Sequence, residues 1–258
     1  MSLTEILGLV LAAGVGGAIN AVAGGGTLVT FPTLLLFGTP PIVANATSTL
    51  ALVVGTSGSI YGFRGHMSAV KPWLRRFVTI SLLGGAIGAA LLIFTSNKMF
   101  AKLVPFLILF ATVIFLAQGF FRRFAGGRIE EQKHFAHRAV SGAVLFQFAV
   151  AIYGGYFGAG IGILMLASLG IIGLSNIHEM NALKTVLGSL INLVAAIVFV
   201  FAGLVNWPRA GLMTVGAVAG YYLGAHYSQR ISQQRVRQII TAVGFIISAV
   251  TFYQEFLK

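Results

Sequence analysis

The sequence predicts an all-α polytopic membrane protein built from two homologous repeats, each of which begins with a broken, glycine-rich helix. Of the 258 residues, 57% are hydrophobic and only 9% are charged, whereas a soluble domain carries about a quarter charged residues. Nearly every apolar run approaches or exceeds the ~20 residues that span a bilayer. A shift of 136 residues superimposes the segment pattern of the second half on that of the first. We therefore expect eight to ten membrane passes.

Eight apolar segments follow one another, and two of them are much longer than the rest. They cover residues 5–38, 42–63, 74–96, 99–121, 139–173, 180–203, 208–228 and 237–257. The first contains Gly24-Gly25-Gly26, and the fifth contains Gly158-Ala159-Gly160-Ile161-Gly162. Because glycine lowers helix stability, we expect each long segment to form two shorter helices joined by irregular backbone.

The repeat predicts the domain organisation. The shift pairs Gly24 with Gly160, Asn45 with Asn181, and Thr49 with Thr185. It gives a first repeat over residues 1–121, a basic cytoplasmic linker over 122–138, and a second repeat over 139–258. For the linker we prefer a solvated loop without a binding role.

The basic residues favour one of two topologies. If each long segment crosses once, there are eight passes, and six of the 17 basic residues lie outside: Lys98, Lys102, Lys184, Arg230, Arg235 and Arg237. If each crosses twice, there are ten passes, and only Lys98, Lys102, Arg209 and Lys258 lie outside. The second count obeys the positive-inside rule better. It places both termini outside, and it makes the repeats inverted because each half has an odd number of passes. The long segments are short for two full crossings, so we expect half-helices that meet near mid-membrane.

Composition and motifs argue against other classes of function. The net charge is +12, and the basic residues lie mostly in two short loops, as in a membrane protein. We therefore expect the protein to lie in a lipid bilayer and not to bind nucleic acid. None of the five acidic residues forms a pair suited to acid–base catalysis. The histidines lack metal-ligand spacing, and no serine has a Gly-x-Ser-x-Gly context. We expect neither an enzyme nor a cofactor nor a metal site.

The two glycine clusters are candidates for a binding site. Unwound backbone exposes N–H groups, and the N-terminus of a half-helix favours an anion. The alternative is close packing of helices through small residues. We prefer that alternative for Gly84-x-x-x-Gly88 and for Gly216-x-x-x-Gly220-x-x-x-Gly224.

Segment 180–203 carries a polar stripe on an otherwise apolar helix. Asn181, Thr185, Ser189 and Asn192 follow helical spacing around Lys184. The first half has a similar stripe with Asn45, Ser48, Thr49, Thr56 and Ser59. Lys184 either lines a cavity and supplies a cation for an anionic substrate or extends to the cytoplasmic interface, and the sequence leaves both open.

Five further residues are candidates for a role in transport. Asn20 precedes the first glycine cluster and either faces the substrate or forms a hydrogen bond between helices. Tyr153 and Tyr156, in the corresponding stretch of the second half, are weaker candidates. His178 and Glu179 are the first candidates for a coupled proton.

These motifs resemble the sulfite exporter TauE/SafE family, also called the toluene sulfonate uptake permease family. The matching elements are the run Gly17 to Pro32, the segment Asn45-Ala46-Thr47-Ser48, and the echo Gly158 to Gly162 followed by Asn181-Ala182-Leu183-Lys184. The resemblance spans essentially the whole chain. It implies a carrier in the bacterial inner membrane for sulfite, sulfoacetate or another organosulfonate, with export the expected direction.

We therefore expect a secondary transporter that works by alternating access. The residues expected to bind the anion are Asn20, Gly24, Gly25, Gly26, Asn45 and Ser48 on one wall and Gly160, Gly162, Asn181, Lys184 and Thr185 on the other. The first alternative is an anion channel that uses the same polar stripes. The second is a membrane-embedded scaffold or enzyme subunit. The sequence does not decide whether the protein forms a homodimer, because a lipid face and a subunit face are equally apolar.

Overall fold

The computed structural model describes residues 1–22, 24–62, 67–126, 136–171, 174, 177–227 and 233–257, which form ten helices and no strand. The helices are α1 (Leu3–Val22), α2 (Thr27–Leu36), α3 (Pro41–Gly62), α4 (Met67–Phe94), α5 (Asn97–Gly126), α6 (Ala136–Tyr156), α7 (Ile161–Ile171), α8 (Ile177–Phe201), α9 (Trp207–Tyr227) and α10 (Gln233–Phe256). Five of them, α1, α4, α5, α8 and α10, contain stretches long and apolar enough to cross a membrane. The all-helical membrane fold is thus confirmed.

Both long segments are broken as predicted. The first forms α1 and α2, and the fifth forms α6 and α7. The helix before each break ends in the same way: the N–H of Gly24 bonds to the Ile19 carbonyl at 3.1 Å, and the N–H of Gly158 bonds to the Tyr153 carbonyl at 3.2 Å. The φ angles of 70° and 81° at these two glycines belong to the left-handed region, which glycine adopts without strain.

The breaks correct one detail of the predicted pairing. The 136-residue shift pairs Gly24 with Gly160, but Gly158 is the residue that ends its helix as Gly24 does. In the second half, the residue that corresponds to Gly24 therefore lies two positions before the one that the shift of 136 residues gives. At the next helices the shift holds, since α3 begins at Pro41 and α8 at Ile177.

Each short helix folds back along the helix before it. Ser168 of α7 donates a hydrogen bond to the Ala143 carbonyl of α6 at 3.3 Å. In the first half, Arg209 bonds both to Glu5 of α1 and to the Phe37 carbonyl that follows α2. Both ends of segment 5–38 therefore lie at the same end of the molecule. With 10 and 11 residues, α2 and α7 are only about 15 Å long, half the thickness of the hydrocarbon core.

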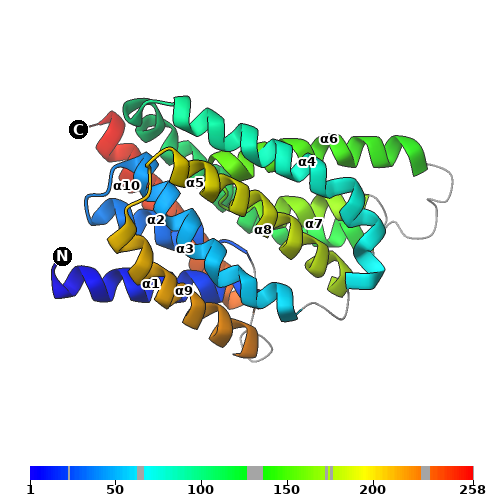
Figure 1. Ribbon diagram of the computed structural model, residues 1–258, viewed down its shortest axis with the longest axis horizontal. Coiled ribbons are helices and arrows are strands. Elements are labelled where there is room, and N and C mark those ends of the chain that lie inside the picture. The colour runs from blue at the N-terminus through cyan, green and yellow to red at the C-terminus, as the bar shows by residue number, and fades with distance from the viewer. Residues whose placement is uncertain are drawn as a thin grey trace.

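The helices pack in two groups, and each group combines both halves of the sequence (Figure 1). In the first group, α9 packs against α1 and α3, and α2 packs against α1 and α3. In the second group, α4 packs against α6 and α8, and α7 packs against the same two helices. Helices α5 and α10 pack against each other, and α3 contacts α8 between the groups. Replacing each helix of one half by the helix at the same position in the other half turns one group into the other.

Small residues allow the closest helix pairs. A Cβ atom added to Gly220 would overlap the Gly14 carbonyl of α1, and one added to Gly88 would overlap the Ile152 carbonyl of α6. Backbones approach this closely only where side chains are missing. The packing interpretation of the two Gly-x-x-x-Gly motifs is therefore confirmed.

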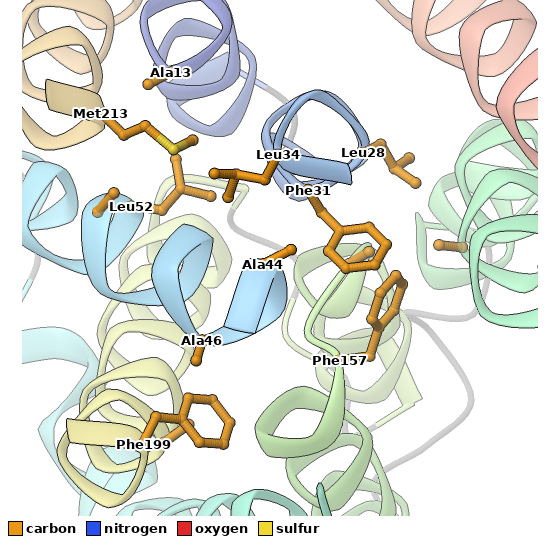
Figure 2. Close-up of a cluster of buried hydrophobic side chains, with 14 of the residues drawn as sticks. Ala13, Leu28, Phe31, Leu34, Ala44, Ala46, Leu52, Phe157, Phe199 and Met213 are labelled. Atoms are coloured by element: carbon orange, nitrogen blue, oxygen red, sulfur yellow. The ribbon is translucent and has the colours of Figure 1, made fainter. Parts of the chain in front are cut away.

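The buried core joins the two breaks. Phe31 of α2 meets Phe157, the residue after α6, edge to face with ring centroids 5.3 Å apart. Figure 2 shows this pair beside Leu34 and Ala44, while Leu52 and Met213 pack where α3 meets α9. Both phenylalanines are fully buried. Aromatic burial of this kind is among the larger contributions to a core, and it fixes the two breaks against each other.

The two termini lie at the same end of the molecule, and α6 extends to the opposite end (Figure 1). The first half thus begins at one end and the second half at the other. The predicted linker 122–138 falls partly in α5 and α6 and otherwise outside the described residues.

Candidate functional site

A pocket lies between the two helix breaks. Its first wall includes Asn20, Gly24 and Gly25, and its second wall includes Gly160 and Gly162. The cavity volume is about 80 Å³. A single water needs about 10–15 Å³ of such space, so the pocket has room for several waters or for one small solute.

Asn20 organises the first break. Its Oδ1 accepts hydrogen bonds from the N–H groups of Gly25 at 2.6 Å and Gly26 at 2.8 Å. Its Nδ2 donates to the hydroxyl of Tyr221 on α9 at 2.8 Å. Asn20 therefore holds the irregular backbone just before α2 and forms the hydrogen bond between helices that was the alternative for this residue. The N–H groups of Gly25 and Gly26 are already bonded and are not free donors for a ligand.

The second break is held differently. The Tyr153 hydroxyl donates to the Ala159 carbonyl at 2.8 Å. This bond uses a backbone carbonyl of the break, whereas Asn20 uses backbone N–H groups of the first break. Within the described residues, the N–H groups of Gly160 and Gly162 have no hydrogen-bond partner. Both glycines line the pocket at the start of α7, where the helix dipole places partial positive charge. The second break is thus the more suitable of the two for an anion.

Lys184 enters the pocket from α8. A Cβ atom on Gly162 would lie 3.3 Å from Lys184 Cδ, so the lysine side chain passes directly over the start of α7. The ammonium group forms no ion pair in the described part of the chain, where Arg209 and Glu5 make the one that is present. An unpaired cation among apolar helices is costly, which makes this position a strong candidate for function.

The polar stripe of α8 forms most of the second wall. Thr185, Ser189 and Asn192 line the pocket with Lys184, and Gly188 leaves space between them. The Oγ atom of Ser189 is buried without a hydrogen-bond partner in the structure. Buried hydroxyls are normally satisfied, so this group has unused capacity toward a bound molecule.

Several lining residues were not among the predicted binding residues. Thr56 of α3 and Tyr221 of α9 complete the first wall, and Thr56 had appeared only in the first-half stripe. The others are Ala21, Thr27, Gly158, Ile161, Gly188, Ser189 and Asn192. For Ser189 and Asn192 the signal was their helical spacing from Lys184. For Tyr221 no local signal exists, because its place depends on the packing of α9 against α1.

Four predicted residues lie outside the pocket lining. Gly26 packs against the Gly16 backbone. Asn45 donates from Nδ2 to the Tyr156 carbonyl at 3.0 Å, and Ser48 Oγ lies 2.6 Å from Thr30 Oγ1. Asn181 lies one helical turn before Thr185, on the stripe but beyond the lining. The first three are occupied in packing or in hydrogen bonds between helices.

The two proton candidates lie at the start of α8. His178 belongs to this helix, but its side chain lies outside the described part of the structure. Glu179 precedes Lys184 by more than one turn and is not part of the pocket lining.

An apolar helical bundle with two broken helices around a central polar pocket defines a multi-pass membrane transporter. The chain belongs to the family described as sulfite exporter TauE/SafE, whose model matches residues 9–251. It is similar to a probable membrane transporter protein of Haemophilus influenzae, with 30% identity over 92% of this chain and 90% of that protein.

Two further relatives carry similar names. The probable membrane transporter protein YfcA of Escherichia coli K12 is 26% identical over 93% of this chain and 86% of its own length. The probable membrane transporter protein ORF9 of a Sinorhizobium species is 27% identical over 93% of this chain and 89% of its own length. No solved structure matches this chain. The relatives agree with the expectation of a transporter rather than an enzyme.

Proposed function

We propose that this protein is a secondary transporter that exports a small sulfur-containing anion across the bacterial inner membrane by alternating access. The observation that supports it most is the position of Lys184. This cation lies at the start of α7, beside the unbonded N–H groups of Gly160 and Gly162 and the unsatisfied hydroxyl of Ser189. All of these groups favour an oxyanion.

The size of the pocket supports a small substrate. A cavity of about 80 Å³ has room for a small solute of the size of a sulfur oxyanion. The neutral donors Thr185 and Asn192 on the same wall would bind the remaining oxygens. The substrate-binding residues that we propose are Asn20, Gly160, Gly162, Lys184 and Thr185, extended by Ser189, Asn192, Thr56 and Tyr221. Gly24 and Gly25 shape the first wall, because their own N–H groups are already bonded.

The moving parts would be the two helix groups rather than the two halves of the sequence. The first wall belongs to the first group and the second wall to the second group. A hinge between the groups would therefore open the pocket to either side in turn. Because both groups contain α-helices from each half, a movement of one half against the other would have to break the packing inside both groups.

The proposed topology has ten segments with both termini in the periplasm. It is supported by the folding back of α2 along α1, which returns the chain to the end where it began. It also fits the distribution of basic residues.

Membrane potential can supply the energy for export. Moving an anion out of a negative interior releases about 2.3 kcal/mol per charge per 100 mV. Concentrative export that persists when the potential is clamped at zero would require a coupled ion, and Glu179 and His178 stay the first candidates.

The test is counterflow in proteoliposomes that hold the purified protein. Unlabelled internal sulfite should stimulate the uptake of labelled sulfite, because a carrier exchanges substrate without net flux. Flux without stimulation would identify the alternative, an anion channel. No flux for any sulfur anion would contradict the proposed function and favour a scaffold or enzyme subunit.

Lys184 gives the matching variant test. Lys184→Gln should weaken the apparent affinity more than tenfold, because a charged hydrogen bond contributes about 2 kcal/mol. Lys184→Arg should keep most of the affinity, and Lys102→Gln, on an exposed position of α5, should change nothing. Unchanged affinity in Lys184→Gln would favour the alternative in which the Lys184 side chain extends to the cytoplasmic interface.

A further inference from the structure

The pocket contains one formal charge. Among the described residues that line it, Lys184 is the only one with a charged side chain. The others are glycines, apolar residues or neutral donors such as Thr185, Asn192 and Tyr221. The only titratable neighbour on the opposite wall is therefore a phenol, which is neutral near physiological pH.

Among the described side chains, the helices packed against α8 add no second charge to the pocket. These helices are α3, α4, α6 and α7. Their described titratable side chains are Lys71, Arg75 and Arg76 of α4, which are exposed near its start, and Tyr153 and Tyr156 of α6. On α8 itself, Glu179 is more than one turn away and outside the lining. None of these groups belongs to the pocket.

One cation balances one anionic charge. A monoanion beside Lys184 forms a neutral pair inside the apolar bundle. A dianion would leave one negative charge uncompensated in a region of low dielectric, which is strongly unfavourable. The neutral donors of the wall can bind oxygens of either species, so they do not remove this difference.

We propose that the pocket selects its substrate as a monoanion: hydrogen sulfite or a monovalent sulfonate, in preference to the sulfite dianion or to sulfoacetate. The proposal rests on the proposed function and adds the charge state that is transported. It distinguishes between sulfur anions of different charge, which the family resemblance does not do. Sulfoacetate carries two charges because its carboxylate is ionised near neutral pH.

The experiment compares three anions in wild-type proteoliposomes from mildly acidic to mildly alkaline pH. Sulfite changes between monoanion and dianion in this range, methanesulfonate stays a monoanion, and sulfoacetate stays a dianion. The total concentration that gives half-maximal counterflow is measured for each, with protein-free liposomes as the blank for leakage.

The expected results differ for the three anions. For sulfite, the half-maximal total concentration should rise by about tenfold per pH unit at alkaline pH, because the monoanion fraction falls by that factor. For methanesulfonate it should stay constant, and sulfoacetate should be transported poorly at every pH.

Three other outcomes would overturn the proposal. A half-maximal total sulfite concentration that does not rise with pH would show that the dianion binds at least as well as the monoanion, while transport itself would stand. A parallel rise for methanesulfonate would show that a group of the protein titrates instead of the substrate. Absence of flux for all three anions would remove the proposed function and the charge selection with it.

Discussion

The side-chain amide of Asn20 joins Tyr221 to the first helix break. Its Nδ2 donates to the Tyr221 hydroxyl at 2.8 Å, and its Oδ1 accepts from Gly25 and Gly26. Tyr221 fits because Gly55 of α3 has no side chain: a Cβ atom there would lie 2.5 Å from the tyrosine ring. One tyrosine on α9 thus fixes the orientation of the amide that holds the first break just before α2.

Replacing Tyr221 by Phe tests this connection. The variant keeps the ring but removes the acceptor for Asn20 Nδ2, and an unsatisfied buried donor costs about 1–3 kcal/mol. We expect a several-fold loss of apparent affinity in counterflow and a lower unfolding temperature in detergent. Tyr222→Phe is the matched control, since Tyr222 is the next residue of the same helix and is exposed. Equal behaviour of the two variants would show that the hydroxyl of Tyr221 is not needed.

Gly162 provides a second test, which acts on the position of Lys184. In Gly162→Ala, the new Cβ atom would lie 3.3 Å from Lys184 Cδ, so the lysine chain must shift within the pocket. We expect a loss of about 1 kcal/mol in anion binding, several-fold in affinity, with little change in unfolding temperature.

The control for this variant is Gly188→Ala. Gly188 lines the same pocket, but a Cβ atom there meets nothing closer than 4.0 Å. It should therefore reduce affinity less than Gly162→Ala does. The reverse order would argue that cavity volume, and not the position of Lys184, sets the affinity.

The sequence predicts the breaks and the stripe of α8 because both are local. Glycine clusters act on the residues around them, and Thr185, Ser189 and Asn192 share a face through helical spacing alone. The all-helical fold likewise follows from long apolar segments. These features need no knowledge of which helices touch.

The predicted residues that lie outside the pocket lining, and the lining residue that was not predicted, depend on contacts between distant segments. Asn45 and Ser48 are polar in an apolar helix, but they bond to the Tyr156 carbonyl and to Thr30. Polarity alone does not separate a cavity wall from a hydrogen bond between helices. Nothing near Tyr221 in the sequence shows that α9 packs on α1, so its place beside Asn20 could not be predicted.

The mixed helix groups predict which crosslinks the transport cycle tolerates. Ser81 of α4 and Gln147 of α6 belong to different halves of the sequence but to the same group, and their side chains are hydrogen-bonded at 3.1 Å. The chain has no cysteine, so the double variant Ser81→Cys with Gln147→Cys forms a disulfide without competition from other thiols of the protein.

Flux should survive this crosslink, because the two helices are expected to move as one body. Each single cysteine variant is the control for the substitution itself, and reduction of the crosslinked protein is the control for the bond. Flux that is lost on crosslinking and restored on reduction would mean that the halves, and not the groups, move.

Arg209 connects α9 to both ends of the first long segment. Its guanidinium binds Glu5 of α1 with a shortest distance of 2.6 Å, donates to the Phe37 carbonyl at 2.9 Å, and bonds to Thr39 before α3. The side chains of Arg209 and Glu5 are only 17% and 13% exposed. Arg209→Gln leaves the Glu5 carboxylate without its cation, so we expect a loss of about 2–3 kcal/mol in stability.

Arg209→Lys distinguishes charge from geometry. Lysine keeps the charge but lacks the planar set of donors that reaches three partners at once, so its unfolding temperature in detergent should fall between those of wild type and Arg209→Gln. Lys98→Gln, at an exposed position near the start of α5, should leave it unchanged. Full stability of Arg209→Lys would show that the ion pair alone holds this end of the first group and that the bonds to Phe37 and Thr39 contribute little.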